Sequence, residues 1–137
     1  MPRWANGKVP DRSKVKYYRL PDGHAARNHL IAVYRSSAKH RDLKWSLTNK
    51  QAFALFQGTC VYCGEKPSRV YAPPRLKGGY ICNGIDRVNS DKGYTVSNTV
   101  SCCSRCNEAK NDLSYDEFIA WARRVVEYTS RFVEIKL

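Results

Sequence analysis

The sequence lacks several features that would assign it to a broad class of protein. No hydrophobic run approaches the roughly 20 residues of a transmembrane helix, and the first residues, MPRWANGKVP, do not resemble a secretory signal peptide. No internal repeat or low-complexity tract is present. Acidic residues are scarce, with 12 Asp and Glu against 24 Lys and Arg. We therefore expect no membrane partner and a cytoplasmic protein, in a reducing compartment where cysteines more often bind metal than form disulfides.

The excess of basic residues is uneven along the chain. The net charge is +12, and residues 1–50 hold 12 Lys and Arg against three Asp, whereas residues 51–137 hold 12 against nine acidic residues. A positive field concentrated in one third of a chain attracts phosphates and favours a nucleic-acid partner. Solubility alone is the alternative explanation. With 137 residues, of which 42% are hydrophobic, a single domain with a small core is expected.

Four of the six cysteines form two Cys-x-x-Cys pairs separated by 39 residues, namely Cys60, Cys63, Cys103 and Cys106. Two such pairs can supply four thiolates to one tetrahedral Zn²⁺. The spacing therefore predicts a structural zinc site. We interpret Cys82 and Cys102 as buried small hydrophobic residues, although Cys102 could replace Cys103 as a ligand at the expense of the two-residue spacer.

Helices are expected on both sides of this region. Residues 1–23 form a basic arm with three prolines, and Ala25–Arg41 has helical periodicity. Thr48 and Gln51 predict a capping box on a second, short helix that ends at Gly58. A second capping box, Ser114 with Glu117, begins a final amphipathic helix, and the tail RFVEIKL could extend that helix or add a strand.

Between the cysteine pairs the pattern predicts a hairpin followed by a helix. Residues 66–79 are a loop or an irregular hairpin, rich in Pro and Gly. A strand over 80–88, a turn over 89–93 and a returning strand over 94–102 come next, and a helix follows from Ser104 to about Asn111.

This constellation resembles the HNH (His-Me finger) nucleases, specifically the small zinc-stapled proteins of phage type. The segments that carry the resemblance are CVYCG, GIDRV, GYTVSN, CCSRCNEAK and DLSYDEF, within residues 45–125. The implied fold is α+β, a ββα-metal core stapled by a four-cysteine zinc site, with N-terminal helices and a C-terminal helix. The implied organisation is the arm 1–23 and one HNH-like domain over 24–137, made of a helical lead-in (24–58), the core (59–112) and the C-terminal helix (113–137).

The resemblance also implies roles for five residues. Asp86 and Asn107 match the ligands of a catalytic divalent metal, and their hard oxygens suit Mg²⁺ or Mn²⁺. Asn98 matches the Asn that braces the loop between the strands through backbone hydrogen bonds. Lys110 matches a helix lysine near the substrate phosphate. Arg87 stands where the family usually has its general-base His, and a permanently protonated guanidinium is a poor base.

Three interpretations of Arg87 are open at this point. It could clamp the scissile phosphate while a metal-bound hydroxide, or a base such as His24, His29 or His40, activates the attack. The hydrolytic centre could be slow or inactive, or Arg87 could be purely structural.

The function that the resemblance implies is a metal-dependent endonuclease, phage-encoded, that cuts one or both strands of double-stranded DNA in a bacterial host cell. The alternative is an HNH-fold zinc protein that binds nucleic acid with weak or no catalysis. In either case we expect the nucleic-acid backbone to be contacted by Arg27, Arg35, Lys39, Arg41 and Arg105.

Overall fold

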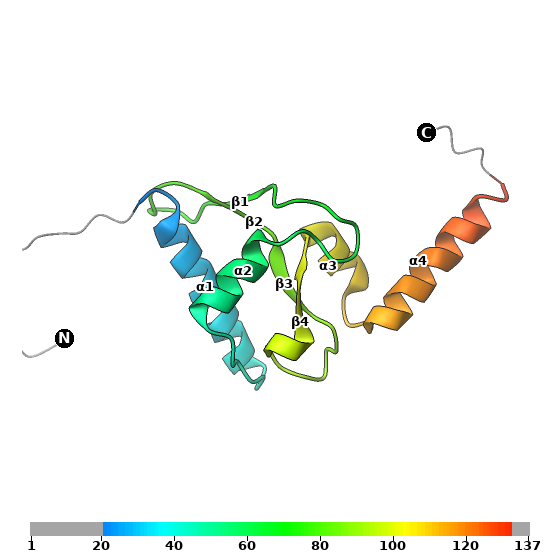
Figure 1. The fold of residues 1–137 in the computed structure, drawn as a ribbon, viewed down its shortest axis with the longest axis horizontal. Coiled ribbons are helices and arrows are strands. Elements are labelled where there is room, and N and C mark those ends of the chain that lie inside the picture. Colours follow the sequence, from blue (N-terminus) through cyan, green and yellow to red (C-terminus); the bar gives the residue numbers. More distant parts are fainter. Residues whose placement is uncertain (1–20, 133–137) are drawn as a thin grey trace, which may run out of the picture.

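The computed structural model describes residues 21–132, so the predicted basic arm lies almost entirely outside the described residues. Its secondary structure confirms the predicted α+β class. Two helices come first, α1 (His24–His40) and α2 (Asn49–Gln57), followed by two hairpins, β1 (Arg69–Tyr71) with β2 (Tyr80–Cys82) and β3 (Gly84–Arg87) with β4 (Thr99–Cys102). A 3-10 turn, η2 (Val96–Asn98), precedes β4, and the chain continues into α3 (Ser104–Lys110) and α4 (Tyr115–Thr129). Figure 1 shows α1 and α2 on one side of the β3–β4 hairpin and α3 beside its end.

Both predicted capping boxes are present. The Thr48 hydroxyl accepts from the Gln51 backbone N–H while the Gln51 side chain accepts from the Thr48 N–H, and Ser114 and Glu117 repeat this arrangement at the start of α4. Each box satisfies backbone donors that no residue inside the helix can reach. Gly58 follows α2 as predicted.

The two long strands expected between the cysteine pairs are shorter than predicted. The stretch 80–88 is divided at Asn83 into β2, which pairs with β1, and β3, which pairs with β4. The Asn83 amide donates to the carbonyls of Gly58 and Glu65, and its backbone N–H donates to that of Phe56. These bonds hold Asn83 against the end of α2, so the chain changes partner strand there.

The returning strand predicted over 94–102 is also wrong in its first half. Only Thr99–Cys102 pairs with β3, in the register Gly84 opposite Cys102 and Arg87 opposite Thr99. Tyr94 instead bridges to Trp45 in a parallel arrangement, because its backbone N–H and C=O bond to Lys44 and Ser46. The loop thereby docks on the segment between α1 and α2.

The core lies between α1, α2 and the β3–β4 hairpin. Its buried members include Leu30, Ile31, Ala38, Leu47, Ala52, Phe56, Cys82, Ile85 and Tyr94. Tyr34 joins α1 to the hairpin, since its hydroxyl accepts from the Ile85 N–H at 3.1 Å and its ring contacts those of Phe56 and Tyr94. This contact satisfies an edge donor of β3 with a side chain of α1, which fixes the helix against the strand.

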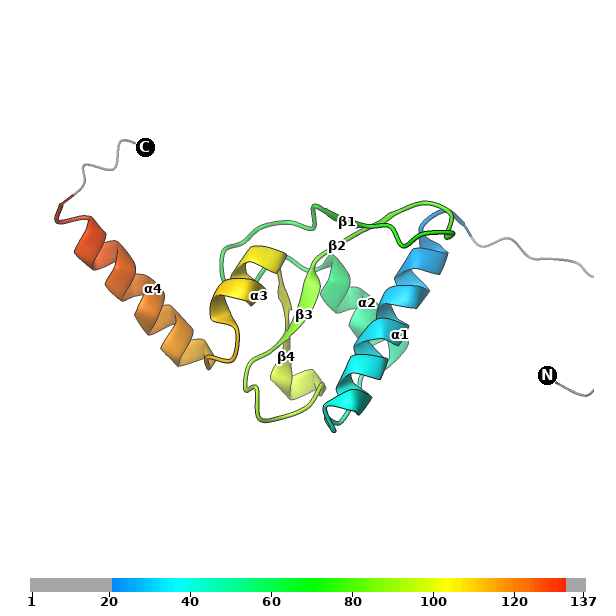
Figure 2. The same cartoon turned by 180° about the vertical axis from the view of Figure 1, so that it is seen from behind.

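The last helix departs from the sequence-based expectation in its packing. The predicted apolar face is present, but only Phe118 of α4 is buried. Figures 1 and 2, which view the chain from opposite sides, both show α4 extending away from the remaining elements. The helix ends at Thr129 and Arg131 lies in a turn, while residues 133–137 lie outside the described residues. None of the described helices is both long and apolar enough to cross a lipid bilayer.

Candidate metal centre and adjoining cleft

Four cysteine sulfurs converge at the entrance to the β3–β4–α3 unit. The Sγ atoms of Cys60, Cys63, Cys103 and Cys106 all lie within 4.8 Å of one another. The Sγ atoms of Cys63 and Cys103 are 3.7 Å apart. Tetrahedral coordination with Zn–S bonds of about 2.3 Å separates the sulfurs by about 3.8 Å, so the cluster has the dimensions of a four-thiolate metal site.

The backbone around the cluster favours thiolates. Cys103 is the N-cap of α3, and its sulfur accepts from the Cys106 N–H at 3.4 Å. Burial opposes ionisation of Cys60, but backbone hydrogen bonds from Cys103, Cys63 and Tyr62 outweigh it and lower the pKa of Cys60 to about 6. The thiolate is the form that binds metal, so the site is chemically suited to a soft divalent ion.

The two remaining cysteines are not in this cluster. Cys82 and Cys102 are both about 1% exposed. Burial raises the pKa of the Cys102 thiol, which keeps it protonated. The structure thus selects Cys103 over Cys102 as the fourth sulfur.

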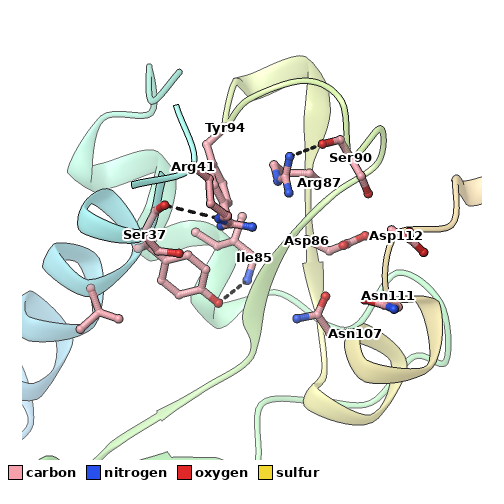
Figure 3. Close-up of a pocket in the computed structure, with 12 residues that line it drawn as sticks. Ser37, Arg41, Ile85, Asp86, Arg87, Ser90, Tyr94, Asn107, Asn111 and Asp112 are labelled. Atoms are coloured by element: carbon pink, nitrogen blue, oxygen red, sulfur yellow. Dashed lines mark hydrogen bonds between the residues drawn. The ribbon is translucent and has the colours of Figure 1, made fainter. Parts of the chain in front are cut away.

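A cleft of about 470 Å³ opens beside the cluster, between α1, β3 and α3. Asp86 of β3 lies in its wall, and the side chains of Asn107, Asn111 and Asp112 surround it on the α3 side (Figure 3). Asn107 is exposed, and no hydrogen bond to its side chain occurs within residues 21–132. Asp86 and Asn107, the two metal ligands predicted from sequence, therefore share one cleft with two further oxygen-bearing side chains.

Two residues from different elements hold the Asp86 carboxylate in place. Asp86 is 5% exposed, and its Oδ2 accepts from the Tyr62 hydroxyl at 2.7 Å. The Lys110 ammonium lies 3.3 Å from the same oxygen and donates to the Arg87 carbonyl at 3.0 Å. Burial, followed by the hydrogen bond to Asp86, raises the pKa of Tyr62, so the hydroxyl remains a donor to the carboxylate.

Lys110 has a different environment from the one expected. The sequence resemblance implied a lysine near the substrate phosphate, but Lys110 is 0% exposed and no atom of it is accessible from the cleft in this conformation. Its charge is matched by Asp86, as the cost of burying a lone ammonium requires. Lys110 is thus positioned to orient Asp86 and not to contact a ligand.

Asn98 braces the loop between the two strands as expected. Its side-chain amide donates to the carbonyls of Asn89 and Gly93, and its side-chain oxygen accepts from the Asn89 N–H. Three bonds from one buried side chain fix residues 89–93. Gly93 is required in this loop, since a Cβ there would lie 2.4 Å from the Lys44 carbonyl oxygen.

Arg87 also bonds to this loop. One guanidinium nitrogen donates to the carbonyls of Ser90 and Lys92, and the guanidinium carbon lies 5.4 Å from the centre of the Tyr94 ring. The side chain is half-buried in the cleft wall, with the Ser90 bond visible in Figure 3. Of the three interpretations, this geometry directly supports the structural one, in which Arg87 ties the loop to β3.

The histidines offered as alternative bases lie away from the cleft. None of His24, His29 and His40 lines it. His29 shares a hydrogen bond with the Tyr71 hydroxyl, and His40 lines a separate shallow surface on α1. The expectation that one of them serves the cleft finds no support in this arrangement.

The five predicted nucleic-acid contacts fall into three groups. Arg27 stacks its guanidinium 3.9 Å from the centre of the Phe53 ring, between α1 and α2, which makes it a packing residue. Arg35 bonds to Asn49, and Lys39 is exposed on the same helix. Arg41 lines the cleft and donates to the Tyr94 hydroxyl at 3.0 Å, whereas Arg105 lines a different cavity beside the cysteine cluster.

Sequence reasoning missed Tyr62 and Asp112. Tyr62 stands between the first two cysteines, where the metal knuckle fixes its backbone, but nothing local predicts that its hydroxyl reaches Asp86, 24 residues away. Asp112 follows α3 directly, and a carboxylate one turn beyond Asn107 and Lys110 was the available signal.

Comparison with known proteins gives the fold an independent basis. The solved structure of the rare-cutting HNH restriction endonuclease PacI superposes with a TM-score of 0.55 over 78% of this chain and 82% of the PacI chain, at 22% sequence identity. An uncharacterized protein of Acanthamoeba polyphaga mimivirus, R423, is 33% identical over 95 residues. That match covers 69% of this chain and 16% of the viral protein, so the chain spans about one sixth of that relative's length. No protein-family model matches the chain. The chain has the fold of an HNH endonuclease, as the sequence resemblance predicted.

Proposed function

We propose that this chain is a metal-dependent endonuclease that hydrolyses phosphodiester bonds in double-stranded DNA. The observation that carries the proposal is the Asp86 carboxylate, fixed by Tyr62 and Lys110 in the wall of a cleft that also presents the Asn107 amide and the Arg41 guanidinium. Fixed oxygen donors beside an exposed cation suit a site that holds a divalent ion against a phosphate.

The donors in the cleft fit a hard divalent ion. A carboxylate has about four lone-pair positions, and the bonds from Tyr62 and Lys110 leave some of those of Asp86 available. Asn107 adds an exposed amide oxygen. Asp86 and Asn107 would hold Mg²⁺ or Mn²⁺, which when bound supplies Lewis-acid stabilisation of charge on the phosphate and the leaving oxygen.

The remaining residues position the substrate and move the proton. Arg41 lies at the edge of the cleft, where its charge can neutralise a backbone phosphate. Arg87 and Asn98 keep the loop 89–93 in place, so the cleft wall is preorganised. Asp112 is the one carboxylate other than Asp86 that lines the cleft, and we assign it the role of accepting the proton from the attacking water.

The four-cysteine cluster would hold a structural Zn²⁺. Its sulfurs come from two loops 40 residues apart and close the ββα unit at the ends of β4 and α3. All four positions are protein ligands, which is typical of structural and not catalytic zinc. The phage origin, the bacterial host and the cytoplasmic location stay predictions from the sequence.

A plasmid-nicking assay tests the proposal. The zinc-loaded protein should convert supercoiled plasmid to nicked or linear DNA with Mg²⁺ or Mn²⁺, and EDTA should stop the conversion. Asp86→Ala and Asn107→Ala should each lower the rate by about 100-fold or more, on the scale of losing one transition-state contact. The matched control is Asn111→Ala, an exposed amide in the same cleft, which should retain most of the activity. Cleavage that survives Asp86→Ala would refute the assignment.

A second function is favoured by one observation. Arg87 replaces the family's base and is engaged with backbone carbonyls, which suits an HNH-fold protein that binds nucleic acid without cutting it. Salt-sensitive DNA binding with no nicking in either metal would identify this function. A large gain in nicking by Arg87→His would show that the native residue disables a base position.

A further inference from the structure

The most conspicuous surface outside the cleft is the apolar face of α4. This face consists of Tyr115, Phe118, Ile119, Trp121, Ala122, Val125, Val126 and Tyr128. Phe118 is buried against Tyr62, but Trp121 and Val125 are each 42% exposed, and Val126 and Tyr128 are more than half exposed. Contiguous apolar surface of this kind marks an interaction site.

The spacing on this face is that of a helix-pairing seam. Phe118, Trp121, Val125 and Tyr128 follow one another at intervals of three, four and three residues. Intervals that alternate between three and four align side chains along one stripe, which is the pattern by which helices pair in coiled coils. The stripe continues for the length of the helix, although nothing in residues 21–132 covers it beyond Phe118.

The charges on α4 point to a protein partner and away from nucleic acid. The helix carries three acidic residues, Asp116, Glu117 and Glu127, and only two basic residues, Arg123 and Arg124. Its net charge is therefore −1 in a chain of net charge +12. A helix that lay on a phosphate backbone would be expected to carry the opposite balance.

The same charges are complementary to those of a second α4. Asp116 and Arg123 lie on one flank of the apolar face, two helical turns apart, and Glu117 and Arg124 lie on the other. In an antiparallel pair centred at the level of Ala120, each flank meets the same flank of the partner helix. Asp116 then lies opposite Arg123 of the other copy, and Glu117 lies opposite Arg124, so four ion pairs border the seam.

The apolar residues also match in this register. Trp121 of one copy meets Ile119 of the other, and Phe118 meets Ala122. Large residues thus face smaller ones, which is how interdigitating helices fill the space between them. We propose that the chain forms a homodimer in solution through antiparallel pairing of α4.

Sedimentation equilibrium of the zinc-loaded chain at several concentrations tests the proposal. The expected mass is twice the 15.7 kDa of one chain, falling toward one chain on dilution. Trp121→Glu with Val125→Glu, which places two charges in the seam, should raise the dimer Kd by about 100-fold or more. The charge-matched control, Ala120→Glu with Lys50→Gln, also lowers the net charge by two but alters exposed positions away from the seam, and it should leave the Kd unchanged.

A charge exchange tests the orientation of the pair. Arg123→Glu alone opposes two acids on each flank and should weaken the dimer, and Asp116→Lys added to it should restore the affinity, because the exchange re-forms the ion pair in the opposite sense. A wild-type mass that stays at one chain throughout would overturn the proposal, as would a dimer insensitive to the seam substitutions. Recovery that fails in the exchanged variant would overturn the antiparallel register. These masses are independent of nuclease activity.

Discussion

The pair of Lys110 and Asp86 offers the sharpest test of how the cleft is built. Lys110 is fully buried, and its ammonium lies 3.3 Å from a carboxylate that is itself 5% exposed. Replacing one partner of a buried ion pair leaves the other charge without compensation, at a cost of about 3–5 kcal/mol. We therefore expect Lys110→Met to lower the free energy of unfolding by about that amount, although it exchanges a charged side chain for an apolar one of similar length.

The double substitution separates the charge from the packing. In Lys110→Met with Asp86→Asn no unpaired charge remains, and the Tyr62 hydroxyl can still donate to the Asn side-chain oxygen. The loss of stability should then be clearly smaller than the sum of the two single losses, with a coupling energy of at least about 1–3 kcal/mol.

Urea denaturation at neutral pH, followed by circular dichroism with zinc present throughout, measures all four proteins of this cycle. The slopes must agree for the free energies to be compared. A loss below about 1 kcal/mol for Lys110→Met, or strictly additive losses, would show that the charges are not paired in a buried site and would refute the reasoning.

Three further predictions concern the metal cluster, the tyrosine and the cleft edge. Cys103→Ser should lose the bound zinc and most of its folded circular dichroism signal, whereas Cys102→Ser should keep one zinc per chain by mass spectrometry; equal zinc content would contradict the assignment of the fourth ligand. Tyr62→Phe should cost about 1.5–3 kcal/mol, since the lost bond is to a charged acceptor; because the folded-state pKa is raised, this contribution should be constant up to about pH 10 and shrink above it, and a contribution that grows with pH would be inconsistent with the bond. Arg41→Ala should reduce the salt dependence of DNA affinity by about one phosphate contact, and an unchanged slope in filter binding would remove Arg41 from the interface.

Local signals in the sequence were sufficient for much of the fold. The capping boxes at Thr48 and Ser114 depend on residues three positions apart, and the cysteine knuckles also depend on short spacing, so both were predictable. The hydrogen bonds of Asn98 followed from the resemblance to a known family.

The features that were missed all depend on distant partners. The break at Asn83 arises from carbonyls 18 and 25 residues away, and the early end of β4 pairing arises from the docking of Tyr94 on Trp45. Lysine is rarely buried, so the environment of Lys110 could not be inferred from its position on a helix. The exposure of α4 is likewise a property of the assembled chain, since its sequence resembles that of a core-facing helix.

Anomalous diffraction from a crystal of the zinc-loaded protein soaked in Mn²⁺ tests the central claim most directly. We predict a manganese peak in the cleft, within about 2.0–2.4 Å of an oxygen of Asp86 and the side-chain oxygen of Asn107. The peak should be absent from Asp86→Asn crystals that retain zinc at the four cysteines. A manganese peak that avoids both side chains, or an empty cleft at saturating Mn²⁺, would contradict the account.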